Sequence, residues 1–290
     1  MLYQVRQSTS FSYASPVSNA HHALRMKPIT GFEQSLVSFD LEITPEPIET
    51  SERRDFYGND MTLITIEDPH DRMMVTARAE VEVERDRVFD ELAPGWEQVQ
   101  DEVVTSCDAS SLAPAHFLFF SRKAQSDPTI TLYAAESFKP GRSIVEAASD
   151  LTMRIHADFD YVPGATDVST RSSDAFIDRK GVCQDFAHIM ISGMRGMGLP
   201  AAYVSGYLRT VPPEGEQRLE GADATHAWIA VWCGEEMGWR GFDPTNAIVA
   251  GSDHVILAMG RDYDDVSPID GVFIGIGDHT MSVSVDVVPL

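Results

Sequence analysis

The sequence predicts an α+β fold in two parts. Residues 1–140 should form an antiparallel β-sandwich, and residues 141–290 a core of helices packed on an antiparallel sheet. Two patterns support this. Apolar and polar side chains alternate in short runs of the first part, which is typical of half-buried strands. In the second part apolar residues recur at helical spacing to about residue 198, and strand-like runs follow.

The first part, to about residue 140, is predicted to be all β. Short strands at close spacing, with Pro, Gly, Asn and Asp between them, favour a sandwich. We expect the acidic, less regular residues 86–111 to form a connector. Residues 113–123 could form a short helix or a buried strand, because periodicity alone does not decide over such a short run. The runs that alternate are residues 3–13, 36–43, 61–66 and 74–83.

The second part begins with helices. Ser143 is the expected N-cap of a helix over residues 143–156, because Glu146 follows three positions later in the capping-box pattern. A short helix is expected over residues 172–179. A third should begin at Cys183 and end near residue 196, before Pro200. Strands are predicted over residues 201–208, 225–233, 236–242, 272–276 and 281–288.

Composition limits the classes of partner. Acidic residues outnumber basic ones by 45 to 22, and the net charge of −23 argues against nucleic acid and anionic membranes as partners. The N-terminus has no secretory signal, and no run has the length of a membrane helix. Three cysteines cannot all pair within one chain, which favours free thiols in a reducing compartment. We therefore expect a cytoplasmic protein, and the sequence leaves its oligomeric state open.

Cys183 is the predicted nucleophile. A cysteine on the first turn of a helix lies near unpaired backbone N–H groups and the positive end of the helix dipole, which favours the nucleophilic thiolate. The alternative is a buried structural cysteine, and we assign that role to Cys107 and Cys233, which lack such surroundings.

A thiolate enzyme needs a base and a group that orients it. His226, in a strand-like run, is the predicted base, and Asp243, held extended by the following proline, is the predicted orienting residue. His188 competes for the role of base. It follows Cys183 by five residues on the same helix and points about 140° away from it, so we expect it to be hydrogen-bonded beneath the site. We expect Asp185 to turn away from the thiol and bond to backbone or a nearby loop.

At these residues the sequence resembles the bacterial transglutaminase-like superfamily of papain-fold cysteine enzymes. The matching segments include GVCQDFAH at 181–188, THAWIAVW at 225–232 and GWRGFDPTN at 238–246, with LPAAYVSGYL at 199–208 and GRDYDDV at 260–266. The N-terminal YQVRQSTSFSYASPV and HALRMKP are similar to the β-rich domain that precedes this core. The resemblance implies the same triad of Cys183, His226 and Asp243.

Further site residues are expected nearby. The backbone N–H of Cys183 is the expected first oxyanion donor, and Tyr161 and Gln184 are candidates for the second. Trp228 should share a sheet face with His226, where it either walls the cleft or packs in the core. No metal-ligand pattern is present, so neither a metal nor a cofactor is expected.

Three functions fit the triad. The leading hypothesis is hydrolysis of an amide, peptide or isopeptide bond in a peptide or protein substrate, through an acyl-thioester. The second is acyl transfer from a glutamine side chain or peptide to an amine, as in transglutaminases. The third is a non-catalytic peptide-binding module, which an intact triad argues against.

Overall fold

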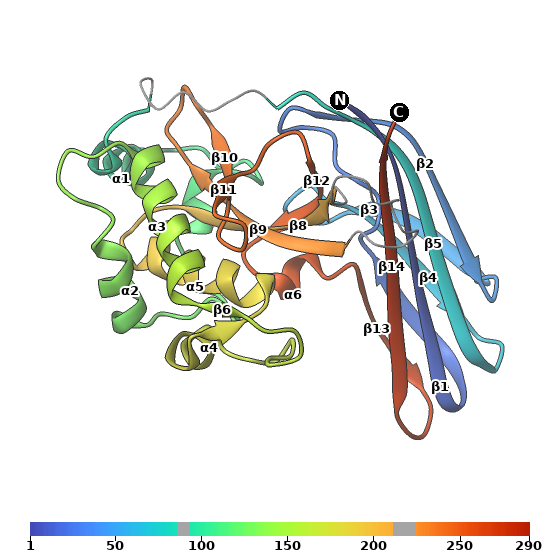
Figure 1. The fold of residues 1–290 in the computed structure, drawn as a ribbon. Coiled ribbons are helices and arrows are strands. Elements are labelled where there is room, and N and C mark those ends of the chain that lie inside the picture. The colour runs from blue at the N-terminus through green and yellow to red at the C-terminus, as the bar shows by residue number, and fades with distance from the viewer. Residues whose placement is uncertain (86–92, 211–223) are drawn as a thin grey trace, which may run out of the picture.

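The computed structural model describes residues 1–85, 93–210 and 224–290. A central sheet lies between a group of helices on one side and a long, curled sheet on the other (Figure 1). This arrangement confirms the predicted α+β class. Among the described residues, no helix combines the length and the apolar character needed to cross a membrane.

The curled sheet has seven antiparallel strands built around β1. The first half of β1 pairs with β5 and β14, and its second half pairs with β4 and β13. Register shifts between these halves, after Ser12 and Ser18, accompany the curl. The strands are β1 (Leu2–Leu24), β2 (Gln34–Thr44), β3 (Glu49–Arg54), β4 (Asp60–Ile66), β5 (His70–Val83), β13 (Ile269–Ile274) and β14 (His279–Pro289).

The central sheet has the strand order β11-β10-β9-β8-β12. Its strands are β8 (Ala201–Leu208), β9 (Ala224–Trp232), β10 (Trp239–Asp243), β11 (Ile248–Val249) and β12 (His254–Gly260). A two-stranded parallel pair, β6 (Asp160–Tyr161) and β7 (Lys180–Gly181), lies before the helix α5.

Helix α5 is buried along nearly its whole length and packs between the other helices and the central sheet (Figure 1). The predicted cap of α3 is confirmed, because the Ser143 side chain accepts a hydrogen bond from the backbone N–H of Glu146. The helices are α1 (Trp96–Thr105), the 3-10 helix η2 (Pro114–Phe117), α2 (Pro128–Ala135), α3 (Ile144–Asp158), α4 (Ser172–Asp178), α5 (Cys183–Gly196) and α6 (Tyr263–Val266).

Several details differ from the sequence expectations or complete them. The prediction of an all-β structure to about residue 140 is wrong, because α1, η2 and α2 lie before that residue. The last two strands, β13 and β14, join β1 instead of the sheet that follows the helices, so the curled sheet contains both ends of the chain. The boundary between residues 140 and 141 stays a prediction. The expected connector contains helix α1, which buries only Val99 and Val103. Residues 113–123 contain the short helix η2 and no strand.

Candidate active site

The start of α5 places Cys183 and fixes the chain before it. Asp185 accepts hydrogen bonds from the backbone N–H of Val182 at 2.8 Å and from the Thr166 hydroxyl at 2.6 Å. A side chain at position 181 would lie 2.7 Å from the Asp185 carboxylate, which explains Gly181. The carboxylate therefore turns back onto the chain and a nearby loop, as expected, and burial raises its pKa.

His226 and Asp243 form a hydrogen-bonded pair. The Nε2 atom of His226 lies 2.8 Å from Oδ2 of Asp243, whose side chain is completely buried. The other carboxylate oxygen, Oδ1, accepts the backbone N–H groups of Thr245 and Asn246 at 2.9 and 3.2 Å. The aspartate thus holds a tight turn with one oxygen and contacts the imidazole with the other.

Charge in the site favours a protonated imidazole. Burial opposes ionisation of Asp243, but hydrogen bonds from His226, His254 and Asn246 outweigh it and hold the pKa of this carboxyl well below its usual range. Burial would lower the pKa of His226, yet hydrogen bonds with Asp243 and Cys183 raise it to about 9. Because Nε2 is engaged by Asp243, Nδ1 is the ring nitrogen left for the thiol. A charged imidazole beside a cysteine favours the thiolate.

Cys183 and His226 share one cavity of about 200 Å³ between the central sheet and the curled sheet. The curled sheet supplies one wall through Gln7 and Thr9 of β1 and Met281 and Val283 of β14. Among the described residues that line this cavity, no lysine, arginine, aspartate or glutamate occurs. The rest of the lining is Val182, Gln184, Tyr203, Ser205, Thr225, Ala227, Tyr263, Pro268 and Ile269.

Comparisons with known proteins agree with this architecture. The family description of the bacterial transglutaminase-like N-terminal region matches residues 3–82, and that of the transglutaminase-like superfamily matches residues 133–244. The uncharacterized protein Rv2569c of Mycobacterium tuberculosis (strain H37Rv) is 36% identical over 99% of this chain and 92% of its own length. The chain belongs to the transglutaminase-like superfamily.

Two further relatives of this superfamily member are informative. A protein-glutamine gamma-glutamyltransferase of Pseudomonas aeruginosa is 34% identical over 93 residues, which is 31% of this chain and 14% of that protein. The crystal structure of a Cytophaga hutchinsonii protein, described as a candidate cysteine protease, has a TM-score of 0.76 at 23% identity and covers all of this chain and 91% of that chain. At this identity the likeness shows the fold.

Of the three other predicted site residues, one lines the cavity and two do not. Tyr161 pairs with Gly181 in the β6-β7 ladder and is half-exposed; burial and the charge of Cys183 raise its pKa. Gln184 lines the cavity. Trp228 shares the sheet face of His226 and stacks on its ring, with centroids 5.9 Å apart, but it is buried and lies outside the lining of this cavity.

His188 has the structural role expected of it. It is buried, and its Nε2 accepts the backbone N–H of Tyr263 at 3.2 Å. Burial lowers its pKa to about 3, so the ring is neutral at ordinary pH and already engaged.

Sequence reasoning missed two partners of Asp243. The side-chain amide of Asn246 donates to Oδ2 at 2.7 Å, and Nε2 of His254 lies 3.2 Å from the same oxygen. His226, Asp243 and His254 are near enough to form a metal-binding group. However, the atoms that would bind a metal are the two Nε2 atoms and Oδ2 of Asp243, and both nitrogens already form hydrogen bonds with this oxygen. We therefore assign them to hydrogen bonding.

The three thiols should react very differently with iodoacetamide near neutral pH. Cys183 should react fastest because it lies beside a charged imidazole. Cys107 is exposed and should react at the slow rate of an ordinary thiol. Cys233 is buried, which raises its pKa to about 12, and should stay unlabelled in the folded chain. Peptide mass spectrometry over time gives the three rates, and equal rates at Cys183 and Cys107 would contradict the assignment of the nucleophile.

Proposed function

We propose that this chain is a cysteine hydrolase that cleaves an amide, peptide or isopeptide bond through an acyl-thioester on Cys183. The observation that carries the proposal is the buried His226–Asp243 pair, in which the carboxylate raises the pKa of an imidazole that shares a cavity with a thiol at the start of a helix. That arrangement supplies a nucleophile and a proton donor in one cavity, with an orienting charge buried behind them.

The proposed reaction has two halves. The Cys183 thiolate attacks the substrate carbonyl carbon, and His226 gives its proton to the leaving nitrogen as the C–N bond breaks. This releases an amine and leaves an acyl-thioester. In the second half, neutral His226 takes a proton from water, the hydroxide attacks the thioester, and the C–S bond breaks to give a carboxylic acid and the thiolate–imidazolium pair.

In both halves of the reaction, negative charge develops on the carbonyl oxygen and is stabilised by hydrogen-bond donors. The backbone N–H of Cys183, at the positive end of α5, is the first that we propose. Tyr161 is the preferred second donor, because it pairs with Gly181, two residues before Cys183, and because burial and the charge of Cys183 raise its pKa, which keeps its hydroxyl proton in place. Gln184 is the alternative, because it lines the cavity.

The substrate that we propose is a peptide or protein segment with an uncharged side chain at the reacting residue. Apart from Cys183 and His226, the described residues of the lining carry no charged side chain, which supports this, because a further ion placed there would lose its hydration without a partner. The three free cysteines favour a reducing location, which supports the cytoplasm as the place of action.

Acyl transfer is the second candidate, favoured by the partial likeness to a protein-glutamine gamma-glutamyltransferase. The chemistry differs only in whether water or an amine attacks the thioester. Peptide amides and glutamine-containing peptides should be incubated with and without a primary amine and their products weighed. We expect carboxylic acids in both cases. An amine adduct as the main product would favour the transferase, and unchanged peptides across a broad panel would contradict both enzymes.

Activity should fall as the pH rises past about 9. The imidazolium of His226 is the proposed proton donor to the leaving nitrogen, and its pKa is raised to about 9. The proton is bound below this pH and lost above it, so the decline lies on the alkaline side. A profile of kcat/KM against pH measures this limb; a limb near the ordinary histidine value of about 6.5 would contradict it.

A further inference from the structure

The least expected feature beside the site is that the Asp243 carboxylate lies between two imidazoles. Its Oδ2 faces Nε2 of His226 on the side of Cys183 and Nε2 of His254 on the buried side. The second imidazole is 1% exposed and has no route to substrate. Its role must therefore be exerted through the aspartate.

The hydrogen bonds around His254 determine where its proton lies. The backbone N–H of Gly251 donates to Nδ1 at 3.3 Å, so this nitrogen carries the lone pair. The proton of the neutral ring is then on Nε2, and it points at Asp243. The charged and titratable groups that face His254 are Asp243, His226 and Arg85, and burial lowers its pKa, which agrees with a neutral ring.

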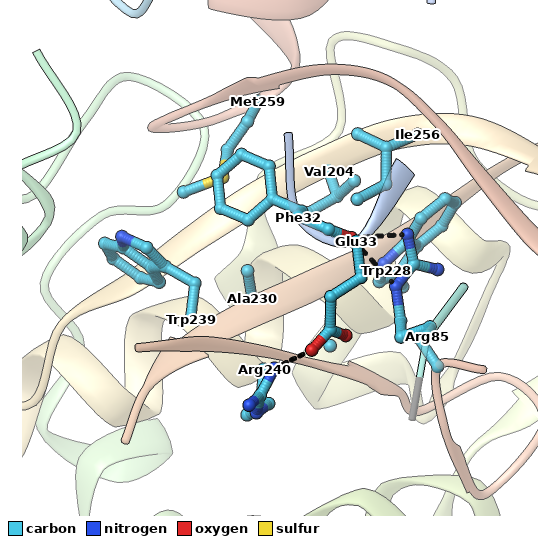
Figure 2. Close-up of a pocket in the computed structure, with 12 residues that line it drawn as sticks. Phe32, Glu33, Arg85, Val204, Trp228, Ala230, Trp239, Arg240, Ile256 and Met259 are labelled. Carbon is cyan, nitrogen blue, oxygen red and sulfur yellow. Dashed lines mark hydrogen bonds and ion pairs between the residues drawn. The ribbon is translucent and has the colours of Figure 1, made fainter. Parts of the chain in front are cut away.

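An arginine that follows the curled sheet's strand β5 holds the backbone at and just before this histidine. Arg85, which follows β5, donates from Nη1 to the carbonyl oxygens of His254 at 2.8 Å and Gly251 at 2.9 Å. It also binds the carbonyl oxygen of Phe32 (Figure 2). Trp228 packs edge-on against His254, with centroids 5.1 Å apart, and stacks on His226.

The space around Arg85 lies where the β1–β2 loop meets the central sheet, and it leaves little room for a ligand. The cavity that Figure 2 shows there has a volume of only about 30 Å³, room for a single water molecule. Glu33 and Arg240 close it with an ion pair of 3.1 Å. Arg85 thus connects the β1–β2 loop and the end of β5 to Gly251 and to His254 at the start of β12.

We propose that His254 is a positioning residue for the Cys183–His226 pair, and that Arg85 holds it in place from the curled sheet. The N–H of the neutral His254 ring fixes the plane and the ionised state of the Asp243 carboxylate. That carboxylate in turn directs Nδ1 of His226 at the thiol. The inference rests on the proposed function only in taking this pair as the reactive one.

Removal of the donor has two consequences. The carboxylate loses a constraint on its rotation, so His226 is less firmly aimed. A buried carboxylate with one donor fewer is also harder to keep ionised, and a neutral Asp243 would no longer stabilise charge on His226. Both effects weaken the thiolate–imidazolium pair.

The test compares His254→Leu, which removes the donor, with His254→Gln, which can restore one, and Arg85→Met, which removes only the support. His22→Leu is the matched control, because His22 is also a buried histidine of lowered pKa, but in the curled sheet. The first readout is the rate at which iodoacetamide labels Cys183 at about pH 5.5, where an ordinary thiol is almost wholly protonated. Cys107 in the same sample is the internal standard.

The second readout is the titration midpoint of His226 by NMR on histidine-labelled protein. We expect His254→Leu to slow the labelling of Cys183 at least tenfold and to move the titration midpoint of His226 from about 9 toward 6.5. His254→Gln should recover most of the rate, Arg85→Met should lie between, and His22→Leu should match the wild type.

A folded His254→Leu variant with the wild-type rate and midpoint would overturn the proposal. If that variant does not fold, wild-type values in Arg85→Met would do the same. Neither readout needs a substrate. A chain without amidase activity whose readouts change as expected would refute only the proposed function, and an active chain with unchanged readouts would refute only this inference.

Discussion

Replacing Cys183 with alanine should abolish turnover while the chain stays folded. The residue is half-buried, and alanine suits the first turn of α5, so the fold loses little. The reaction loses the atom that forms the covalent intermediate. Where a nucleophile of this kind is removed from a catalytic triad, kcat falls by about 10⁶-fold.

The assay is the turnover of whichever peptide amide proves to be a substrate, with circular dichroism to verify the fold. Cys107→Ala is the matched control, because it removes an exposed thiol away from the cavity and should retain full activity. Activity that survives in Cys183→Ala would mean that the hydrolysis uses another nucleophile.

Replacing Asp243 with asparagine should be the next most damaging change. Oδ1 can keep its two backbone hydrogen bonds, so the turn between β10 and β11 stays in place. The charge that holds the proton on His226 is lost, and an amide facing Nε2 favours the wrong tautomer. In a comparable triad this change costs on the order of 10⁴ in kcat, less than loss of the nucleophile.

Exposed Asp101→Asn on α1 is the control for a general effect of charge. Wild-type rates in Asp243→Asn, with Cys183→Ala inactive, would show that another group orients His226. Asp223 and Asp185 would be the next carboxylates to test. Asp185 is already bonded to Val182 and Thr166, and Asp223 lies outside the described residues.

The sequence located the three residues of the proposed triad because each borders an element with a strong local signal. Cys183 begins an apolar helix, His226 lies in an alternating strand, and Asp243 precedes a proline. The strands that contain or follow them were predicted within a few residues. His226 and Asp243 meet because β9 and β10 are neighbours in the central sheet, and Cys183 lies in the same cavity as His226. The resemblance implied this grouping, and periodicity could not show it.

The role of His254 and the pairing of the last two strands escaped prediction because both depend on distant partners. His254 is one histidine among nine at the start of a strand, and only the folded sheet brings it to Asp243. Alternation identified strands near β13 and β14 but carries no information about which strand they join. Helix α1 was missed because two buried valines on an acidic segment give a weak helical pattern.

The most direct test of the central claim is to trap the acyl-enzyme. The chain should be mixed with a reactive ester or thioester of an uncharged peptide, quenched in acid and digested for mass spectrometry. The account predicts an acyl group on the peptide that contains Cys183, removable by hydroxylamine as a thioester should be, and absent from Cys183→Ala. Turnover of the same compound with no adduct on Cys183, or with the adduct on another residue, would contradict it.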